Sequence, residues 1–177
     1  MAFPTKEITA EEREIRNARR QAVLAAWKDE KQAVLEGKGS RDWTEEQQKQ
    51  ILDKGSVHNF EGHHMRSVSY GKTQEEQLAI AGDKNNIQFL EKSKENNEHL
   101  AAHNNNTRNA TNGYYDVKTG QTKCFGNNPP QAPNRERLSN PICQREKINE
   151  QQNEYGVKNS TSINDRNVSY EREIGRG

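Results

Sequence analysis

The sequence predicts a small α+β domain that is mainly helical, with long polar loops and a polar C-terminal extension. Three observations support this fold class. A long amphipathic pattern opens the chain, short strand-like segments follow it, and only 29% of the 177 residues are hydrophobic. A chain of this length can hold one domain with appendages or two small ones, and so few apolar side chains predict a small core.

The first helix is predicted over residues 9–36. Thr9 followed by Glu12 fits a capping box, in which each side chain binds a free backbone N–H of the other residue. Gly37 provides a C-terminal stop. Apolar residues recur at helical spacing and form a narrow stripe: Ile15, Ala18, Ala22, Ala25, Trp27 and Val34. Residues 1–40 are therefore expected to form an N-terminal helical segment.

Two shorter helices are predicted next. Thr44 with Gln47 forms a second capping-box pattern, so a helix is expected over residues 45–53, ending near Gly55. Residues 75–81, EEQLAIA, indicate another short helix or turn.

Strand signals lie on both sides of that short helix. Residues 57–68 are strand-like with a glycine break, and NIQFL at residues 86–90 is a short apolar strand candidate. Ser93 can cap a further helix over residues 94–103, and Asn112-Gly113 is a typical turn pair.

The C-terminal third is poor in large apolar residues, which gives it little surface to bury against its ordering entropy. Residues 41–123 are predicted to form the functional domain, and residues 124–177 a polar, partly irregular extension with short helices around residues 145–152. Cys124 and Cys143 could pair, but two cysteines do not make a disulfide scaffold, so the redox compartment stays open.

Net charge gives little guidance about partners. The formal charge is +1, from 27 basic and 26 acidic residues, so no strong overall field indicates a nucleic-acid partner. The charged face of the first helix, including Arg19 and Arg20, is interpreted as solvated. Neither a signal peptide nor a membrane-spanning run is evident. We expect any export signal to belong to a carrier or to a larger precursor.

The five histidines are unevenly distributed. His63 and His64 are adjacent, whereas His99 and His103 are four residues apart on a predicted helix and would face one metal ion together. His58 is assigned no role. Each pair alone is common on solvated surfaces, but their joint order, with a strand between them, is much more specific.

This order resembles the ββα-metal finger of HNH nucleases such as the colicin DNases, which combine Glu-x-His-His, an Asp-Asn-Ile strand and a helical His-x-x-x-His. The segments EGHHMRSV, NNIQFL, EHLAAH and TNGYYD extend the likeness. Over roughly residues 22–120 the chain is similar to the GH-E/GHH-type nuclease domain of bacterial polymorphic toxins. One departure is Asp83, which stands three residues before Asn86 rather than beside it.

The resemblance implies a division of roles. His63 would bind the metal with His99 and His103, and His64 would be the general base, since a neutral imidazole suits deprotonation of water. A metal ion would act as Lewis acid on the phosphate. Three imidazoles suit one divalent ion, with Zn²⁺ favoured and Mg²⁺, Mn²⁺ or Ni²⁺ as alternatives.

Further residues complete the predicted site. By resemblance, Asn86 would tie the loop between the strands and fix His64, and Glu61 would orient the base or a neighbouring cation. Arg66 is a candidate for contacting the scissile phosphate, because arginine presents a fork of donors; a solvated arginine is the alternative. Residues past the metal helix would reach the DNA backbone: Asn105, Arg108 and Asn109.

The sequence therefore predicts a metal-dependent endonuclease that hydrolyses DNA with little sequence specificity, acting as a secreted or delivered antibacterial toxin in the target cytoplasm. Its partners would be DNA and a cognate immunity protein. An RNase on the same finger stays open, as does a non-catalytic, metal-stapled domain that binds nucleic acid or protein. The absence of an obvious fourth ligand favours catalysis, because structural zinc sites fill four positions.

Overall fold

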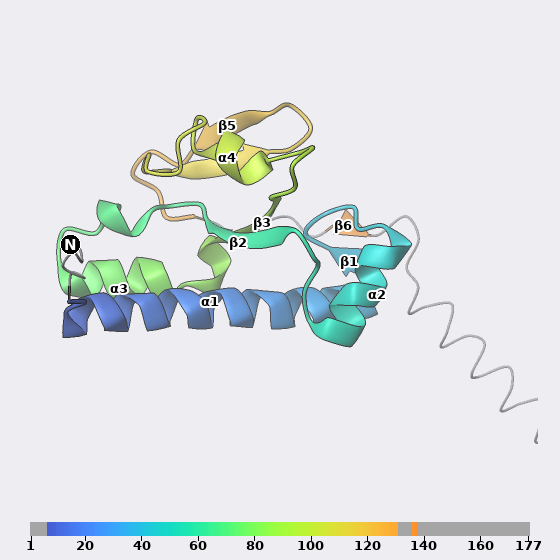
Figure 1. The fold of residues 1–177 in the computed structure, drawn as a ribbon, viewed down its shortest axis with the longest axis horizontal. Helices are drawn as coiled ribbons and strands as arrows, with labels where there is room; N and C mark the ends of the chain where they lie inside the picture. The colour runs from blue at the N-terminus through green and yellow to red at the C-terminus, as the bar shows by residue number, and fades with distance from the viewer. Residues whose placement is uncertain (1–6, 131–135, 138–177) are drawn as a thin grey trace, which may run out of the picture.

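The computed structural model describes residues 7–130 and 136–137, and it confirms the predicted α+β class (Figure 1). Its helices and strands follow one another along the chain as α1 (Ala10–Leu35), β1 (Lys38–Gly39), α2 (Glu45–Lys54), β2 (Phe60–His64), α3 (Gln74–Gly82), β3 (Ile87–Glu91), α4 (Glu98–Ala102), β4 (Gly113–Asp116), β5 (Gln121–Cys124) and β6 (Glu136–Arg137).

Predicted helix caps are present at the first two helices. Thr9 and Thr44 both form capping boxes with the residues three positions ahead. Gly55 ends α2 in the left-handed conformation, with φ of 78°, which glycine adopts without steric cost. A third capping box, at Thr73, opens α3.

Strands β2 and β3 form the centre of the fold. They pair antiparallel, with Phe60 opposite Glu91 and His63 opposite Gln88. Helices α1 and α3 cover one side of this pair, whereas α4 and the β4–β5 hairpin lie on the other (Figure 1). Because successive side chains of a strand point to opposite faces, each strand contributes to both layers.

The larger core fills the layer between the strand pair and the first two helices. Phe89 of β3 stacks on Trp27 of α1, with ring centroids 3.8 Å apart, and Trp43 meets Phe60 edge-on at 5.0 Å. The remaining buried members are apolar: Ala22, Ala26, Val34, Ile51, Val57 and Ile87. Helix α1 is thereby an integral part of the domain.

A buried carboxylate joins α1 to the segment before α2. Glu30, with 0% of its surface exposed, accepts hydrogen bonds from the Trp43 indole at 2.6 Å and from the backbone N–H of Ser40 at 2.7 Å. Buried polar groups are tolerated when they are hydrogen-bonded, so this carboxylate fixes the course of the chain between the two helices.

The second, smaller core lies on the opposite face of the strand pair. Leu90 of β3 packs there with Ala102 of α4 and Tyr115 of β4. The buried Gln88 side chain donates to the backbone carbonyl of Tyr115 at 2.6 Å and accepts from its N–H at 3.0 Å. This two-way contact docks the β4–β5 hairpin onto β3.

Helix α4 is shorter than the predicted helix over residues 94–103. Asn97 caps it by accepting from the N–H of Leu100, and the Ser93 hydroxyl instead closes a turn with the backbone of Asn96. The prediction of Ser93 as the cap is therefore wrong, because local side-chain-to-backbone bonds compete with helix formation there.

A partly buried ion pair fastens the start of α4. The two terminal guanidinium nitrogens of Arg41 donate to the carboxylate of Glu98, at 2.7 and 3.0 Å, and Arg41 also donates to the backbone carbonyl of Phe89. Such bidentate pairs restrict geometry as well as adding energy. They hold α4 against the end of β3.

The part of the C-terminal extension that the structure describes includes a short strand. Strand β6 pairs antiparallel with β1. The predicted helices around residues 145–152, and Cys143, lie outside the described residues. Cys124 is exposed at the end of β5. Within the described part of the chain, no helix has the length and apolar character needed to cross a membrane.

Gly62 lets α1 approach β2 closely. A Cβ atom placed there would lie 2.8 and 2.9 Å from the two methyl carbons of Val23 and 3.2 Å from a methyl carbon of Ile87. Real Cβ atoms do not tolerate such distances, and Val23 has little freedom because it is β-branched and helical.

We therefore expect Gly62→Ala to lower the free energy of unfolding by about 1–3 kcal/mol, the usual cost of overpacking a core. Urea unfolding measures this value. Gly82→Ala is the matched control, since its Cβ would meet nothing closer than Ala18 at 4.0 Å; its stability should change by less than about 0.5 kcal/mol. Equal effects at the two glycines would show that the α1–β2 contact is not tight.

Candidate metal centre

Three histidines from two elements converge on the α4 side of β2. The ligand atoms of His63, His99 and His103 all lie within 4.8 Å of one another. Their ring centroids are separated by 5.3 Å (His63–His99), 4.9 Å (His63–His103) and 5.0 Å (His99–His103). The structure thus brings the three predicted ligands together, while the exposed His58 takes no part.

The orientation of His103 is set by the loop that follows α4. Its Nδ1 lies 2.7 Å from the backbone carbonyl of Asn109, and the Asn109 side chain donates to the carbonyl of His103 at 2.9 Å. A carbonyl can only accept, so Nδ1 carries the proton and Nε2 is left with the lone pair. Metal-binding histidines commonly use their second nitrogen in this way.

Burial and the charges of neighbouring histidines lower the pKa of two members of this cluster, His63 and His99. Burial, followed by the charges of His103 and His99, lowers the pKa of His63 to about 3. Burial is also the main cause that lowers the pKa of His99. Neutral imidazole is the form that binds a metal ion. The three residues consequently fit a divalent cation, with three nitrogen donors and a fourth position for water or substrate.

Glu61 lies on the same face of β2 as His63. Its carboxylate forms an ion pair with Lys92 at 2.7 Å, and its charge acts to raise the pKa of His99. The structure places it beside the metal centre, on the side of α4.

His64 lies on the opposite face of β2, against the helical layer. Its Nε2 donates to the backbone carbonyl of Ala81 at 3.0 Å, which leaves Nδ1 as the proton-accepting nitrogen. Burial lowers the pKa of His64, although the bond to Ala81 opposes that shift and the charge of Arg19 adds to it. The ring is therefore neutral near pH 7 and separate from the three-histidine cluster.

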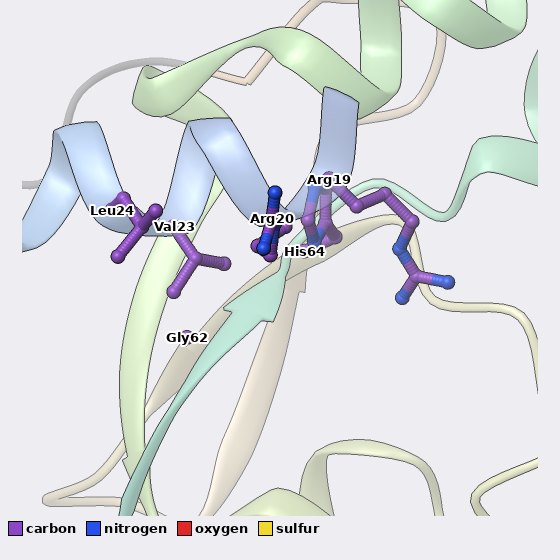
Figure 2. Close-up of a pocket in the computed structure, with 6 residues that line it drawn as sticks. All are labelled: Arg19, Arg20, Val23, Leu24, Gly62 and His64. Carbon is purple, nitrogen blue, oxygen red and sulfur yellow. The ribbon is translucent and has the colours of Figure 1, made fainter. Parts of the chain in front are cut away.

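A shallow pocket opens beside this ring, between α1 and β2. Its volume is about 270 Å³, and Figure 2 shows Val23 directed toward Gly62 across it. The pocket is lined by Arg19, Arg20, Val23, Leu24, Gly62 and His64.

Asn86 links the segments around His64. Its carboxamide accepts from the backbone N–H of Arg66 at 2.8 Å and donates to the carbonyls of Arg66 and Ile80. It is 1% exposed. On the other side, the hydroxyl of Thr111 donates to the carbonyl of His64 at 3.2 Å. These bonds fix the backbone at the end of β2, where the paired histidines stand.

Arg66 is engaged in contacts within the domain. Its guanidinium donates to the side chain of Asn112 at 2.9 Å and to the carbonyl of Gly126 at 2.9 Å. It thereby ties the end of β2 to the segments on either side of the β4–β5 hairpin. These two bonds use Nε and Nη2 of the five-donor guanidinium.

The remaining predicted residues surround the centre. Asn105 and Arg108 are exposed in the loop after α4, where Asn104 and Asn105 adopt positive φ angles of 50° and 60°. Asp83 accepts from the N–H of Asn85 and caps the turn that precedes β3. The displaced aspartate thus has a local structural role.

Sequence reasoning missed the residues that support the centre. The Arg41–Glu98 pair and Gln88 position the metal face, yet in the sequence each is an ordinary polar residue in a polar chain. The position of Glu98 directly before His99, a predicted metal ligand, was the one sequence signal for this supporting role. Nothing in the sequence indicated that Asn109 would bind His103.

Comparison with known sequences agrees with this geometry. Residues 9–91 match the family described as GHH signature containing HNH/Endo VII superfamily nuclease toxin. The matched region runs from the cap of α1 to the end of β3. It begins and ends earlier in the chain than residues 22–120, over which the sequence resemblance was drawn. It includes the Glu-Gly-His-His segment and Asn86, and it ends before His99.

The chain is also similar to short segments of animal teneurins. It is 38% identical to Teneurin-3 of Mus musculus over 80 residues, which are 45% of this chain and 3% of the relative. It is 36% identical over 77 residues to Teneurin-1 and to Teneurin-4 of Homo sapiens, in each case 43% of this chain and 3% of the relative.

These relatives are far longer than the chain, so their similarity concerns one short region only. The adjacent histidines of β2 lie within the residues that match the GHH-signature family. Residues 9–91, just under half of the chain, are therefore similar to the GHH-signature nuclease toxins of the HNH/Endo VII superfamily.

Proposed function

We propose that this domain is a metal-dependent endonuclease that hydrolyses DNA phosphodiester bonds with little sequence specificity. The observation that carries the proposal is the division of adjacent histidines by β2. His63 joins His99 and His103 on one face, while His64 stays outside that cluster with a fixed tautomer. Hydrolysis of a phosphodiester needs a place for a cation and a separate proton acceptor, and this arrangement supplies both.

The three-histidine cluster would hold the cation. When bound there, a divalent metal supplies Lewis-acid polarisation of the phosphate and stabilises the departing oxygen. Zn²⁺ suits three neutral imidazoles best, with Mg²⁺, Mn²⁺ and Ni²⁺ as the other candidates. The carboxylate of Glu61, on the same face, would adjust the charge at the centre and orient nearby cations.

His64 would take the proton from the attacking water. It is neutral near pH 7, as a base must be, and its bond to Ala81 leaves Nδ1 to accept the proton. Asn86 would be a positioning residue, since its bonds to Arg66 and Ile80 fix the backbone that carries His64. Arg66 links segments within the domain through Nε and Nη2, and its Nη1 would be the atom that contacts phosphate.

The proposed biological role follows the family. Because the family consists of nuclease toxins, we infer that this domain acts as a delivered effector in the cytoplasm of a target bacterium, in competition between bacteria. A producing cell would then need a cognate immunity protein that covers the site. Contacts to phosphate carry little sequence information, which agrees with cleavage of many DNA sequences.

The direct test is plasmid cleavage by the wild-type protein and by His64→Ala, each with Zn²⁺, Mg²⁺, Mn²⁺ or Ni²⁺ and each with EDTA. We expect cleavage that requires metal and falls by about 10²–10⁴-fold in His64→Ala, the usual contribution of a general base. His58→Ala is the matched control, because His58 is an exposed histidine outside the site; its activity should equal that of the wild type.

Cleavage that survives EDTA, or that His64→Ala leaves unchanged, contradicts the proposed mechanism. A parallel single-stranded RNA substrate separates a DNase from an RNase. A protein that binds metal and cleaves neither substrate would instead be a metal-stapled binding domain.

The lowered histidine pKa values also predict how acid affects stability. Unfolding returns His63 from a pKa of about 3 to its ordinary value of 6.5. Between these values the unfolded chain binds a proton that the folded chain does not, so the free energy of unfolding falls as the pH falls. For the metal-free protein, His63 alone should contribute a slope of about 1.4 kcal/mol per pH unit.

Urea unfolding of the metal-free wild type and of metal-free His63→Gln, at several pH values between 6.5 and 5, measures this slope. This pH range lies above the range in which carboxylates titrate. The wild type should lose stability more steeply than the variant. Parallel curves for the two proteins would show that His63 is not buried as the structure has it.

A further inference from the structure

We propose that Arg19 and Arg20 of α1 form a phosphate-binding subsite beside His64, and that the substrate backbone crosses the free edge of β2 to reach it. This inference rests on the proposed nuclease function and extends it. It assigns to α1 a direct role in holding nucleic acid, whereas sequence reasoning interpreted both arginines as part of a solvated face.

The position of the pocket supports this role. It lies between α1 and β2, and both arginines line it together with His64 and Gly62 (Figure 2). Tight packing of Val23 on Gly62 closes its floor. The arginines are therefore presented next to the one histidine of the site that is free to act as a base.

Both arginines are also available to a ligand. They are exposed, and within the described residues neither forms a hydrogen bond or an ion pair. Other arginines near the site are already engaged, since Arg41 binds Glu98 and Arg66 binds Asn112. Arginine offers a rigid fork of donors that matches phosphate oxygens, so the uncommitted pair is the natural partner for an anion.

The topology gives the path of that anion. Strand β2 pairs only with β3 among the described strands, so its other edge is open up to His64, where Thr111 and Gly113 bind the carbonyls of His64 and Met65. The metal cluster lies on one face of β2 and His64 on the other. A phosphodiester that meets both must pass around the open edge, and the pocket with Arg19 lies on the His64 side of that edge.

Charge at this place agrees with the assignment. Arg19 and Arg20 place two positive charges on adjacent residues of the pocket that His64 also lines. A bound phosphate would offset the positive charge of the two arginines.

The test measures the steady-state cleavage of a short DNA duplex by metal-loaded Arg19→Gln and Arg20→Gln at several salt concentrations. Each substitution should lower kcat/KM about tenfold, mainly through KM, as expected for the loss of a charge-assisted contact. Each should also reduce the slope of log kcat/KM against log salt concentration by about 1.

Lys49→Gln is the matched control, because it removes one positive charge from the exposed face of α2, outside the pocket. It should keep the wild-type kcat/KM and slope. Thermal unfolding of all three variants checks that the fold is intact, as expected for exposed positions.

The subsite is overturned if the arginine variants keep the wild-type kcat/KM and salt slope, or if their kcat/KM falls no further than that of Lys49→Gln. A wild-type protein that cleaves nothing contradicts the proposed function instead. In that case the affinity for the same duplex, measured over the same salt series, still tests the subsite. Loss of about one unit of slope in each arginine variant would support it, and unchanged slopes would overturn it.

Discussion

The site depends on the alternation of side chains along β2. Because neighbouring residues of a strand point to opposite faces, His63 and His64 enter different layers of the domain. One ring meets the two histidines at α4, and the other lies against the helices and binds Ala81. A shift of β2 by one residue relative to β3 would exchange these environments, so everything that fixes the strand register also fixes the chemistry.

Two sets of contacts hold β2 in that register. On the helical side, Gly62 has no side chain, and this allows α1 to pack directly on the strand. On the other side, Arg41 and Glu98 fasten α4 to β3. Arg41 also connects the two sides, because its guanidinium lies over the Phe60 ring and binds Glu98 of α4.

The sequence predicted much of this arrangement and failed where tertiary contacts decide. Capping boxes at Thr9 and Thr44 are local signals, and the helices that they open lie where expected. The predicted start of α4 was wrong, because the Ser93 hydroxyl accepts from the N–H of Asn96 in a turn and does not cap the helix. The Arg41–Glu98 pair spans 57 positions and leaves no local pattern, so no spacing rule could have found it. Arg19 forms no hydrogen bond or ion pair within the described residues, and this likewise depends on residues that are distant in the sequence.

X-ray absorption spectroscopy of the zinc-loaded protein and of zinc-loaded His64→Ala tests the central claim most directly, because it counts the imidazoles on the metal. The account predicts three histidine nitrogens at about 2.0–2.1 Å, with an oxygen as fourth ligand, in both proteins. Four imidazoles in the wild type and three in His64→Ala would contradict it, since the two adjacent histidines would then share the metal and leave no separate base.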